Sequence, residues 1–229
     1  MHLSGASSAN TNYDVYIYNT GTAVSPTLAV EYVAWTNDTT PPTRGTQDGV
    51  LVKNGAPDRR LLGVVRTTSA GNSIIDLGGV ITGANSANYP KVYLANLYNL
   101  YDASAVYFFG NSWNVTTSGW SVAPSSVYAT APRVSFVQAG STLVTAFLDI
   151  YSNHSGSSIL YVAPGIDSTS TPPSDAFYGE TNSTNGTVGS QWARALAQGK
   201  HDIYYLYQQS GSNTVNEHAA HGSIVTMKV

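Results

Sequence analysis

Residues 35–68 have the sequence WTNDTTPPTRGTQDGVLVKNGAPDRRLLGVVRTT. Two short apolar runs, Val50–Val52 and Leu61–Val65, flank the segment Asn54-Gly55-Ala56-Pro57. An Asn-Gly pair adopts positive φ at little cost, which makes it the strongest short hairpin signal in a sequence. A second turn, Gln47-Asp48-Gly49, comes directly before the first run. The stretch therefore predicts a β-hairpin in the first third of a β-rich domain.

Two arginines, Arg59 and Arg60, follow the Asn-Gly turn. Neighbouring residues of a strand face opposite sides of a sheet. We therefore expect one arginine to point outward into solvent and the other to enter a polar contact.

The length and composition suit a single large β domain. The chain has 229 residues, and sandwiches or barrels of roughly 200–250 residues often form one domain. A chain of this size buries about 70% of its extended surface on folding, so it needs no disulfides. It contains no cysteine, which excludes thiol catalysis and zinc–thiolate sites. We expect one domain over residues 1–229, with residues 1–12 as a flexible N-terminal segment.

The surface is expected to be weakly charged. Charged residues make up only 10% of the chain and the formal net charge is -3, whereas ordinary soluble domains carry roughly 25% charged residues. Duplex DNA and anionic membranes both require clustered lysine and arginine, so neither is an expected partner. The 16 tyrosines, against 5 phenylalanines, suit half-exposed strands and interfaces, because tyrosine has an apolar body and a polar tip.

The sequence shows no targeting or membrane segment. Met1–Gly5 has neither the basic nor the apolar region of a secretory signal. No window approaches the ~20 apolar residues of a membrane span. We therefore expect a soluble protein, and one that works outside a cell would leave it by a route such as lysis.

Short runs of β-branched and aromatic residues recur at intervals of about 8–12 residues, separated by turn residues. Residues 90–101 also fit helical spacing, and we favour a strand there because Pro90 starts the run among β-like neighbours. The pattern predicts an all-β fold, an antiparallel β-sandwich that is jelly-roll-like, with long loops and at most one short helix. The predicted strands, besides the opening hairpin, are residues 13–18, 27–35, 90–101, 106–109, 133–137, 143–151, 158–162, 203–207 and 224–229.

Polar segments between these runs predict the loops. Residues 67–88 predict a long loop with one weak strand, and residues 164–190 predict a second long loop. Residues 113–122, with a tryptophan near each end, predict a hairpin pair. Trp192 and Leu196 are four residues apart, so the segment 191–198 predicts one or two helical turns.

A set of aromatic residues is the candidate ligand-binding site. Tryptophan and tyrosine rings pack well on the apolar faces of sugars and on partner proteins. The set therefore predicts either a sugar-stacking platform or, as we prefer, core packing together with a subunit interface. The candidate ligand-binding residues are Tyr98, Tyr101, Trp113 and Trp120, with Tyr107 nearby in the sequence.

Reactive centres are weakly indicated. Glu217-His218-Ala219-Ala220-His221 offers two imidazoles and one acid, which suits a polar loop better than a metal site, and the order H-E-x-x-H is absent. A triad of Asp149, His154 and Ser155 lacks the G-x-S-x-G elbow. Paired carboxylates for glycoside cleavage would have to come from scattered acids. We expect no catalytic residue, no metal and no cofactor. The scattered acids are Asp149, Asp167, Asp175, Glu180 and Asp202.

Three parts of the opening stretch, Ala34–Thr40, Gln47–Gly55 and Arg59–Thr68, carry a family resemblance. They resemble a module of tailed-bacteriophage virion proteins, namely tail-fibre, tail-tip and head-fibre-like proteins. The chain departs from the pattern at Leu100-Tyr101-Asp102, where a basic residue is expected, and over residues 163–199. Weaker matches extend over much of the chain, to Tyr13–Tyr18, Lys91–Asn99, Gly165–Ser168 and His201–Leu206.

The resemblance implies a non-enzymatic virion structural protein with a contact or host-adhesion role. Such modules are usually displayed as homotrimers on a fibre, a tail tip or the capsid surface. The implied partners are other virion proteins, further copies of the chain and a host cell-surface glycan, with no nucleic acid and no membrane. The alternative function is a carbohydrate-binding module that recognises bacterial surface glycan. A polysaccharide-degrading enzyme is the least favoured hypothesis.

Overall fold

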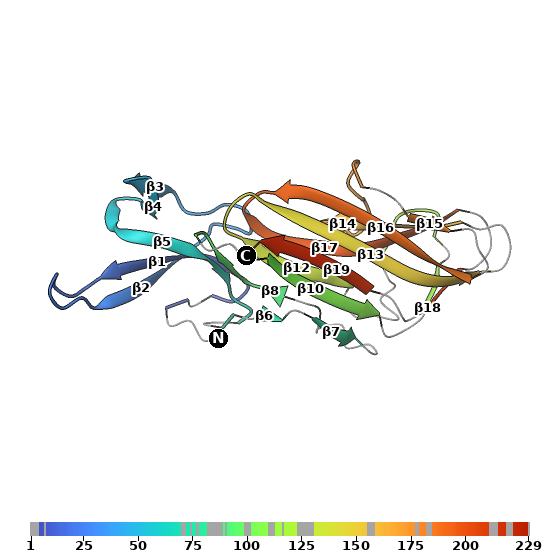
Figure 1. The fold of residues 1–229 in the computed structure, drawn as a ribbon, viewed down its shortest axis with the longest axis horizontal. Helices are drawn as coiled ribbons and strands as arrows, with labels where there is room; N and C mark the ends of the chain where they lie inside the picture. Colours follow the sequence, from blue (N-terminus) through green and yellow to red (C-terminus); the bar gives the residue numbers. More distant parts are fainter. Residues whose placement is uncertain are drawn as a thin grey trace.

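The computed structural model describes residues 5–6, 8–69, 72–73, 75–76, 78–81, 89, 91–98, 102–109, 113–115, 117–122, 131–154, 159–176, 179–181, 185–210, 215–218 and 222–228. Within these ranges the chain forms three β-sheets and no helix (Figure 1). Accordingly, the described residues contain no helix of the length and hydropathy that a membrane span requires. The predicted all-β sandwich is confirmed. Its jelly-roll connection order stays a prediction.

The first sheet, here called the N-terminal sheet, contains the stretch from which the fold was predicted. Its strand order is β2-β1-β5-β4-β3, and β9 also pairs with β5. The predicted hairpin is confirmed and belongs to a three-stranded meander, because β3 pairs with β4 and β4 with β5. The strands are β1 (Asn12–Asn19), β2 (Leu28–Ala34), β3 (Arg44–Gln47), β4 (Val50–Lys53), β5 (Ala56–Arg66) and β9 (Leu94–Asn96).

Both predicted turns have the backbone that their sequences favour. Asp48 and Gly49 have φ of 52° and 77°, which is the two-residue hairpin turn that joins β3 to β4. Gly55, between β4 and β5, has φ of 73°. These left-handed conformations explain the glycine in each turn, and Asp48 adopts one as well.

The β14–β17 sheet is one layer of the sandwich. Its strand order is β15-β14-β17-β12-β8-β6, and all its pairs are antiparallel except the parallel pair of β8 and β12. The strands are β6 (Ile75–Asp76), β8 (Lys91–Val92), β12 (Arg133–Gln138), β14 (Ile159–Ile166), β15 (Gly179–Thr181) and β17 (Gly199–Ser210).

The β13–β16 sheet is the other layer. Its strand order is β11-β18-β13-β19-β10-β7, with β16 also paired to β13, and β7 runs parallel to β10. The strands are β7 (Gly78–Ile81), β10 (Asp102–Phe109), β11 (Trp113–Val115), β13 (Thr142–His154), β16 (Asn185–Leu196), β18 (Val215–His218) and β19 (Gly222–Lys228).

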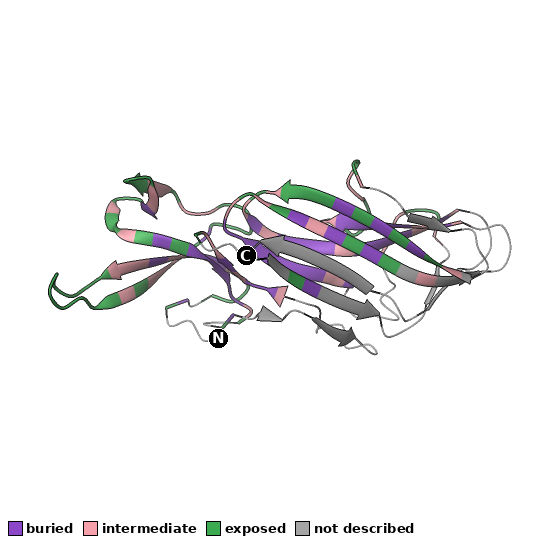
Figure 2. Cartoon of the chain, in the orientation of Figure 1, coloured by how far each residue is buried: buried purple, intermediate pink, exposed green. Residues whose placement is uncertain are grey.

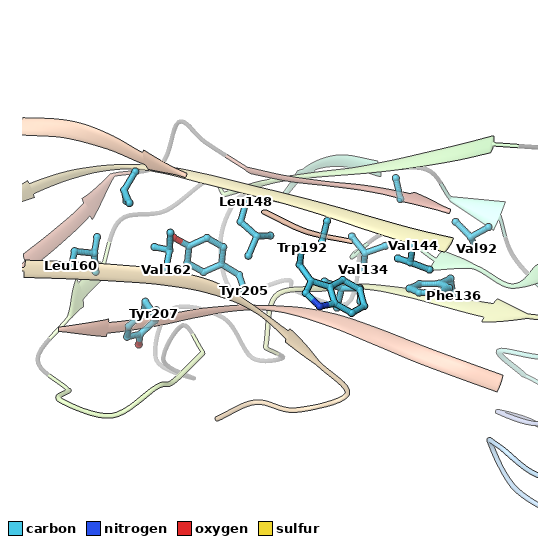
Figure 3. Close-up of a cluster of buried hydrophobic side chains, with 14 residues drawn as sticks. Val92, Val134, Phe136, Val144, Leu148, Leu160, Val162, Trp192, Tyr205 and Tyr207 are labelled. Atoms are coloured by element: carbon cyan, nitrogen blue, oxygen red, sulfur yellow. The ribbon is translucent and has the colours of Figure 1, made fainter. Parts of the chain in front are cut away.

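The main core lies between these two layers. Phe136 and Leu160 from one sheet meet Val144 and Trp192 from the other, and all four are buried. Figure 3 shows the labelled side chains of both sheets directed into the space between the ribbons. The packing of two inner faces is what makes the pair of sheets a sandwich.

The N-terminal sheet is attached to one end of this sandwich, which gives the molecule its elongated shape (Figure 1). A second buried cluster joins the two parts: Trp35, Val64 and Ala95 of the N-terminal region pack against Val137 and Ala139 at the end of β12. Since Phe136 packs in the sandwich core, β12 is buried on both of its faces. The prediction of a single sandwich did not include the separate N-terminal sheet.

The predicted helix over residues 191–198 is wrong, because most of this segment belongs to strand β16. Buried Val188, Ser190 and Trp192 alternate there with exposed residues, which is the two-residue period of a strand. A four-residue separation such as that of Trp192 and Leu196 fits a strand as well as a helix. The pattern used for the helix prediction therefore did not discriminate.

Three further local predictions need correction. Residues 164–190 are not one long loop, because β14 continues to Ile166 and β15 lies within the segment. The described residues of the segment 113–122 pair with other parts of the chain: β11 pairs with β18, and Ser121 forms a bridge with Tyr207. The segment 67–88 contains two short strands, β6 and β7, rather than one, and its residues 82–88 lie outside the described residues.

Candidate functional site

The exposed aliphatic residues of the β1–β2 hairpin form the first candidate contact surface. Strand register places Ile17 directly opposite Val30, and Leu28 lies two residues along on the same side of β2. The side chain of Leu28 is 68% exposed and that of Val30 is 48% exposed, while Ile17 is half-buried. We call Ile17, Leu28 and Val30 the hairpin face.

Among the described residues, cover on the same side of the hairpin lies towards its base. There Tyr13 and Tyr32 meet edge-on, with ring centroids 6.4 Å apart, and Ala6 packs into the cluster. The Tyr13 hydroxyl accepts a hydrogen bond from the Ser8 amide at 2.9 Å, and the Thr67 hydroxyl donates to the Ser8 carbonyl at 2.7 Å. Residues in the expected flexible segment 1–12 therefore pack on the sheet. Figure 2 shows burial near the junction giving way to exposure along the projecting hairpin.

A buried carboxylate lies on the opposite side of the N-terminal sheet. Asp14 accepts two hydrogen bonds from the Arg44 guanidinium, at 2.7 and 2.6 Å, and one from the Trp35 indole Nε1 at 2.8 Å. The Tyr16 hydroxyl donates to the second Asp14 oxygen at 3.0 Å. Burial, and next the Asp14 charge, raise the pKa of Tyr16, so its hydroxyl stays a donor at neutral pH.

This network continues into the sandwich and fixes the two parts to each other. Arg44 Nη1 donates to Gln198 Oε1 at 2.9 Å, and the Lys200 amide donates to the Asp38 carbonyl at 3.0 Å. The Asp38 carboxylate accepts from Arg66 Nη1 at 2.6 Å. The two ion pairs lie within the N-terminal region, and the contacts that cross to the sandwich are the hydrogen bonds from Arg44 and from the Lys200 amide. These bonds and the buried cluster hold the N-terminal sheet against the sandwich.

The arginine prediction is confirmed near the outer part of the N-terminal sheet. Arg59 pairs with Glu31, which also binds Lys53, whereas Arg60 is exposed. Partial burial opposes ionisation, but the hydrogen bonds from Lys53 and Arg59 lower the pKa of Glu31 below its usual value. The Arg59 guanidinium also lies 4.6 Å from the centroid of the Tyr18 ring. These contacts lie on the side of the sheet opposite the hairpin face, whereas the exposed Arg60 is the register partner of Ile17 and borders that face.

A second exposed apolar surface lies on the sandwich. Leu143 and Phe147 of β13 are 54% and 47% exposed, on the side of the sheet that faces away from the core. Their register partners on β16 are the uncharged residues Ala195 and Gln191. We call Leu143, Thr145 and Phe147 the β13 outer face, and the exposed Asp149 lies on the same side of the strand. An exposed apolar sheet surface of this kind suits contact with another protein surface.

The most strongly bonded ionisable residues serve to connect strands. His201 Nδ1 lies 2.7 Å from an Asp167 carboxylate oxygen, and Nε2 lies 2.9 Å from the Ala197 carbonyl. Asp202 pairs with Arg133 and Lys200 and accepts a hydrogen bond from the Ser135 hydroxyl. The described residues contain no group of three His, Asp or Glu side chains arranged to hold a metal ion.

The acids considered as catalytic candidates lie in different parts of the sandwich, and those with described partners have different ones. Asp167 is bonded to His201 and Asp202 to two cations, while Asp175 accepts a hydrogen bond from Trp192 Nε1 at 3.1 Å. Asp149 is on the exposed side of β13. Glu180, His154, Glu217 and His218 lie in strands of which only the backbone is described, and Ser155 and His221 lie outside the described residues.

The predicted aromatic site is not one cluster in the described residues. Tyr98 follows β9 at the junction with the N-terminal sheet and is half exposed. Trp120 adjoins the Ser121–Tyr207 bridge, at the other end of β17 from Gly199, where the sheet meets the junction. Eight strand residues, or about 26 Å, separate Gly199 from Tyr207. Trp113 lies in β11, where its side chain is not described, and Tyr101 is outside the described residues.

Sequence reasoning missed both exposed surfaces. Period-two alternation puts Leu28 and Val30 on one side of a strand, but it does not show which part of that side is covered. The signal for the β13 outer face was alternation within residues 143–149, where Val144, Ala146 and Leu148 are buried and the residues between them are not.

Comparisons with known proteins leave the family open. No protein-family model matches the sequence, and neither does any curated protein. Among solved structures, the chain is similar to the insecticidal delta-endotoxin Cry8Ea1 from Bacillus thuringiensis, with 8% sequence identity and a TM-score of 0.32. The similarity covers 98% of this chain but only 43% of the toxin chain. A likeness at this level does not bear on function.

Proposed function

We propose that this chain is a non-enzymatic structural protein of a bacteriophage virion, placed on a fibre, the tail tip or the capsid surface, with a contact or host-adhesion role. The observation that carries the proposal is the hairpin face. It presents exposed aliphatic side chains on an extension that a buried apolar cluster and the Arg44–Gln198 hydrogen bond join to the sandwich. A projection that is already packed loses little conformational entropy when a partner covers it.

The energetics of burial support a docking role for the hairpin face. Complete burial of one Leu, Val or Ile side chain is worth about 1.5–3 kcal/mol. The hairpin face carries three such side chains, close to the number of strong anchors that dominates many interfaces. The occupant proposed here is another virion protein, and the β13 outer face is proposed as a contact between copies of the chain.

The virion assignment is supported by the resemblance of Ala34–Thr40, Gln47–Gly55 and Arg59–Thr68 to a phage virion module. In the fold these residues belong to the β3–β4–β5 meander and the loops leading to it, which lie beside the hairpin face. The low charge and the absence of cysteine suit a particle component that persists outside a cell.

The experiment that tests this proposal is incorporation into particles. A phage genome carrying the double variant Leu28→Asp and Val30→Asp should give particles that lack this chain, because two carboxylates cannot be buried without a partner. The matched control is Thr22→Asp, which adds a charge at an exposed position in the turn of the same hairpin. Purified particles are assayed for the chain by immunoblotting.

Two outcomes contradict the proposal. One is purified wild-type particles that contain none of this chain. The other is equal incorporation of the wild-type chain and of the Leu28→Asp, Val30→Asp variant, which would show that the hairpin face is not a docking surface.

A further inference from the structure

A hollow of about 480 Å³ opens at the side of the sandwich, between the loop that follows β14 and the last residues of β16. Ile166, Pro172, Pro173 and Leu196 give it an apolar lining, together with the largely buried indole of Trp192. The hydroxyl-bearing Ser168 and Thr171 also line it. The hollow does not involve the hairpin face or the aromatic residues singled out from the sequence.

Side-chain bonds hold the two walls of the hollow together. His201 bonds to Asp167 on one wall, through Nδ1 at 2.7 Å, and to the Ala197 carbonyl on the other, through Nε2 at 2.9 Å. Asp175 accepts from the Trp192 indole at 3.1 Å and lies 3.6 Å from the Arg194 guanidinium. Both ties join the loop after β14 to the β16–β17 region. The hollow is therefore pre-formed rather than a gap between independent loops.

Arg194 lines the hollow, and Asp175, which is not itself a lining residue, pairs with it. Arg194 and Asp175 remain 65% and 47% exposed, so the guanidinium keeps N–H groups, and the carboxylate keeps lone pairs, that a ligand can reach. The two charges offset each other, which disfavours a strongly anionic or cationic ligand. A ligand that matches this arrangement has an apolar face for the prolines and Leu196, and neutral hydroxyls that both donate and accept.

We propose that the hollow beside Trp192 is a binding site for a neutral saccharide. A pyranose ring places its C–H face on Pro172, Pro173 and Leu196. Its hydroxyl groups donate to the Asp175 carboxylate and accept from the Arg194 guanidinium. This site is independent of the proposed docking of the hairpin face, because the two surfaces share no residue.

The test is saturation-transfer NMR and calorimetric titration of the full chain with lactose, cellobiose and N,N′-diacetylchitobiose. At least one disaccharide should bind with a Kd on the order of 1 mM, as a small open site allows. Arg194→Ala should raise that Kd about tenfold, since it removes charge-assisted hydrogen bonds. The matched control is Arg60→Ala, which removes an exposed arginine of the N-terminal sheet and should leave the Kd unchanged.

A second variant distinguishes loss of the binding site from general unfolding of the chain. Pro173→Ser should reduce saturation transfer to the ring C–H protons, while the far-UV circular dichroism stays that of the wild type. Absence of transfer to all three disaccharides would overturn the proposal, as would equal binding by the Arg194→Ala and wild-type chains. The double variant Leu28→Asp and Val30→Asp should still bind the disaccharide, so failure of one proposal is separable from failure of the other.

Discussion

At the scale of single residues, the defining feature is a pair of ionisable groups whose partners come from distant parts of the chain. Asp14 is fully buried and bonded by Arg44 and Trp35, and Arg44 in turn binds Gln198. Strand alternation explains why Arg59 and Arg60 differ, but no local pattern connects position 44 with position 198. Such contacts depend on how the sheets pack, which a single sequence does not reveal.

His201 should make stability depend on pH. Both of its ring nitrogens lie against acceptors, the Asp167 carboxylate and the Ala197 carbonyl, so only the doubly protonated ring donates to both. Burial alone would lower the pKa of His201, but these hydrogen bonds outweigh it and raise the pKa above its usual value. Because the pKa of His201 is higher in the folded state, protonation stabilises the fold at pH values below the unfolded-state pKa. This stabilisation is lost as pH rises through the folded-state pKa.

We therefore expect the unfolding free energy to fall between about pH 6.5 and the folded-state pKa, by up to about 1.4 kcal/mol per pH unit. Urea denaturation across that range measures it. In His201→Gln the residue cannot titrate, so this fall should disappear. An identical pH profile for the wild type and His201→Gln would show that His201 is not the group responsible.

At the scale of elements, β5 illustrates how a glycine permits close pairing. A Cβ added at Gly63 would lie 2.1 Å from the Ala95 carbonyl oxygen of β9, which no real structure tolerates. Gly63 pairs with Asn96, and the Leu97 amide donates to the Leu62 carbonyl at 3.0 Å. β9 carries Ala95, part of the cluster that joins the N-terminal sheet to the sandwich.

Replacing Gly63 should therefore weaken the junction. We expect Gly63→Ala to destabilise the fold by about 1–3 kcal/mol, the usual cost of overpacking. The matched control is Gly189→Ala in β16, where the nearest atom would lie at an ordinary 3.5 Å and the change should stay within about 0.5 kcal/mol. Urea denaturation compares the two, and equal midpoints would contradict the close approach of β5 and β9.

The elements also show where sequence patterns succeed and fail. The pairs Asn54-Gly55 and Asp48-Gly49 predicted the positions of their turns correctly, because the positive φ that their glycines adopt is a local requirement. The spacing of Trp192 and Leu196 gave the wrong helix prediction, because a separation of four residues fits both a strand and a helix. The pairing of β11 with β18 was missed, since their residues are about a hundred positions apart in the chain. Turn chemistry is local, whereas the choice of strand partner is not.

At the scale of the whole molecule, the described residues of the sandwich and of the N-terminal sheet include the two uncovered apolar surfaces named above. The recurring runs of β-branched and aromatic residues predicted an all-β sandwich, and the fold confirms it. The sequence patterns did not predict the separate N-terminal sheet. The buried cluster of Trp35 and Val64 forms only where this sheet meets β12. The hairpin face and the β13 outer face lie on different sheets, so the two contacts proposed for them do not compete for the same residues.

The central claim is that these uncovered surfaces exist for assembly, and the mass of the purified chain in solution tests it most directly. Light scattering coupled to size exclusion should give three times the 24.2 kDa of one chain for the wild type. Phe147→Asp should shift the species towards one chain, whereas Gln191→Asp, at its register partner on β16, should shift it less. A wild-type chain that remains monomeric at high concentration would contradict the account.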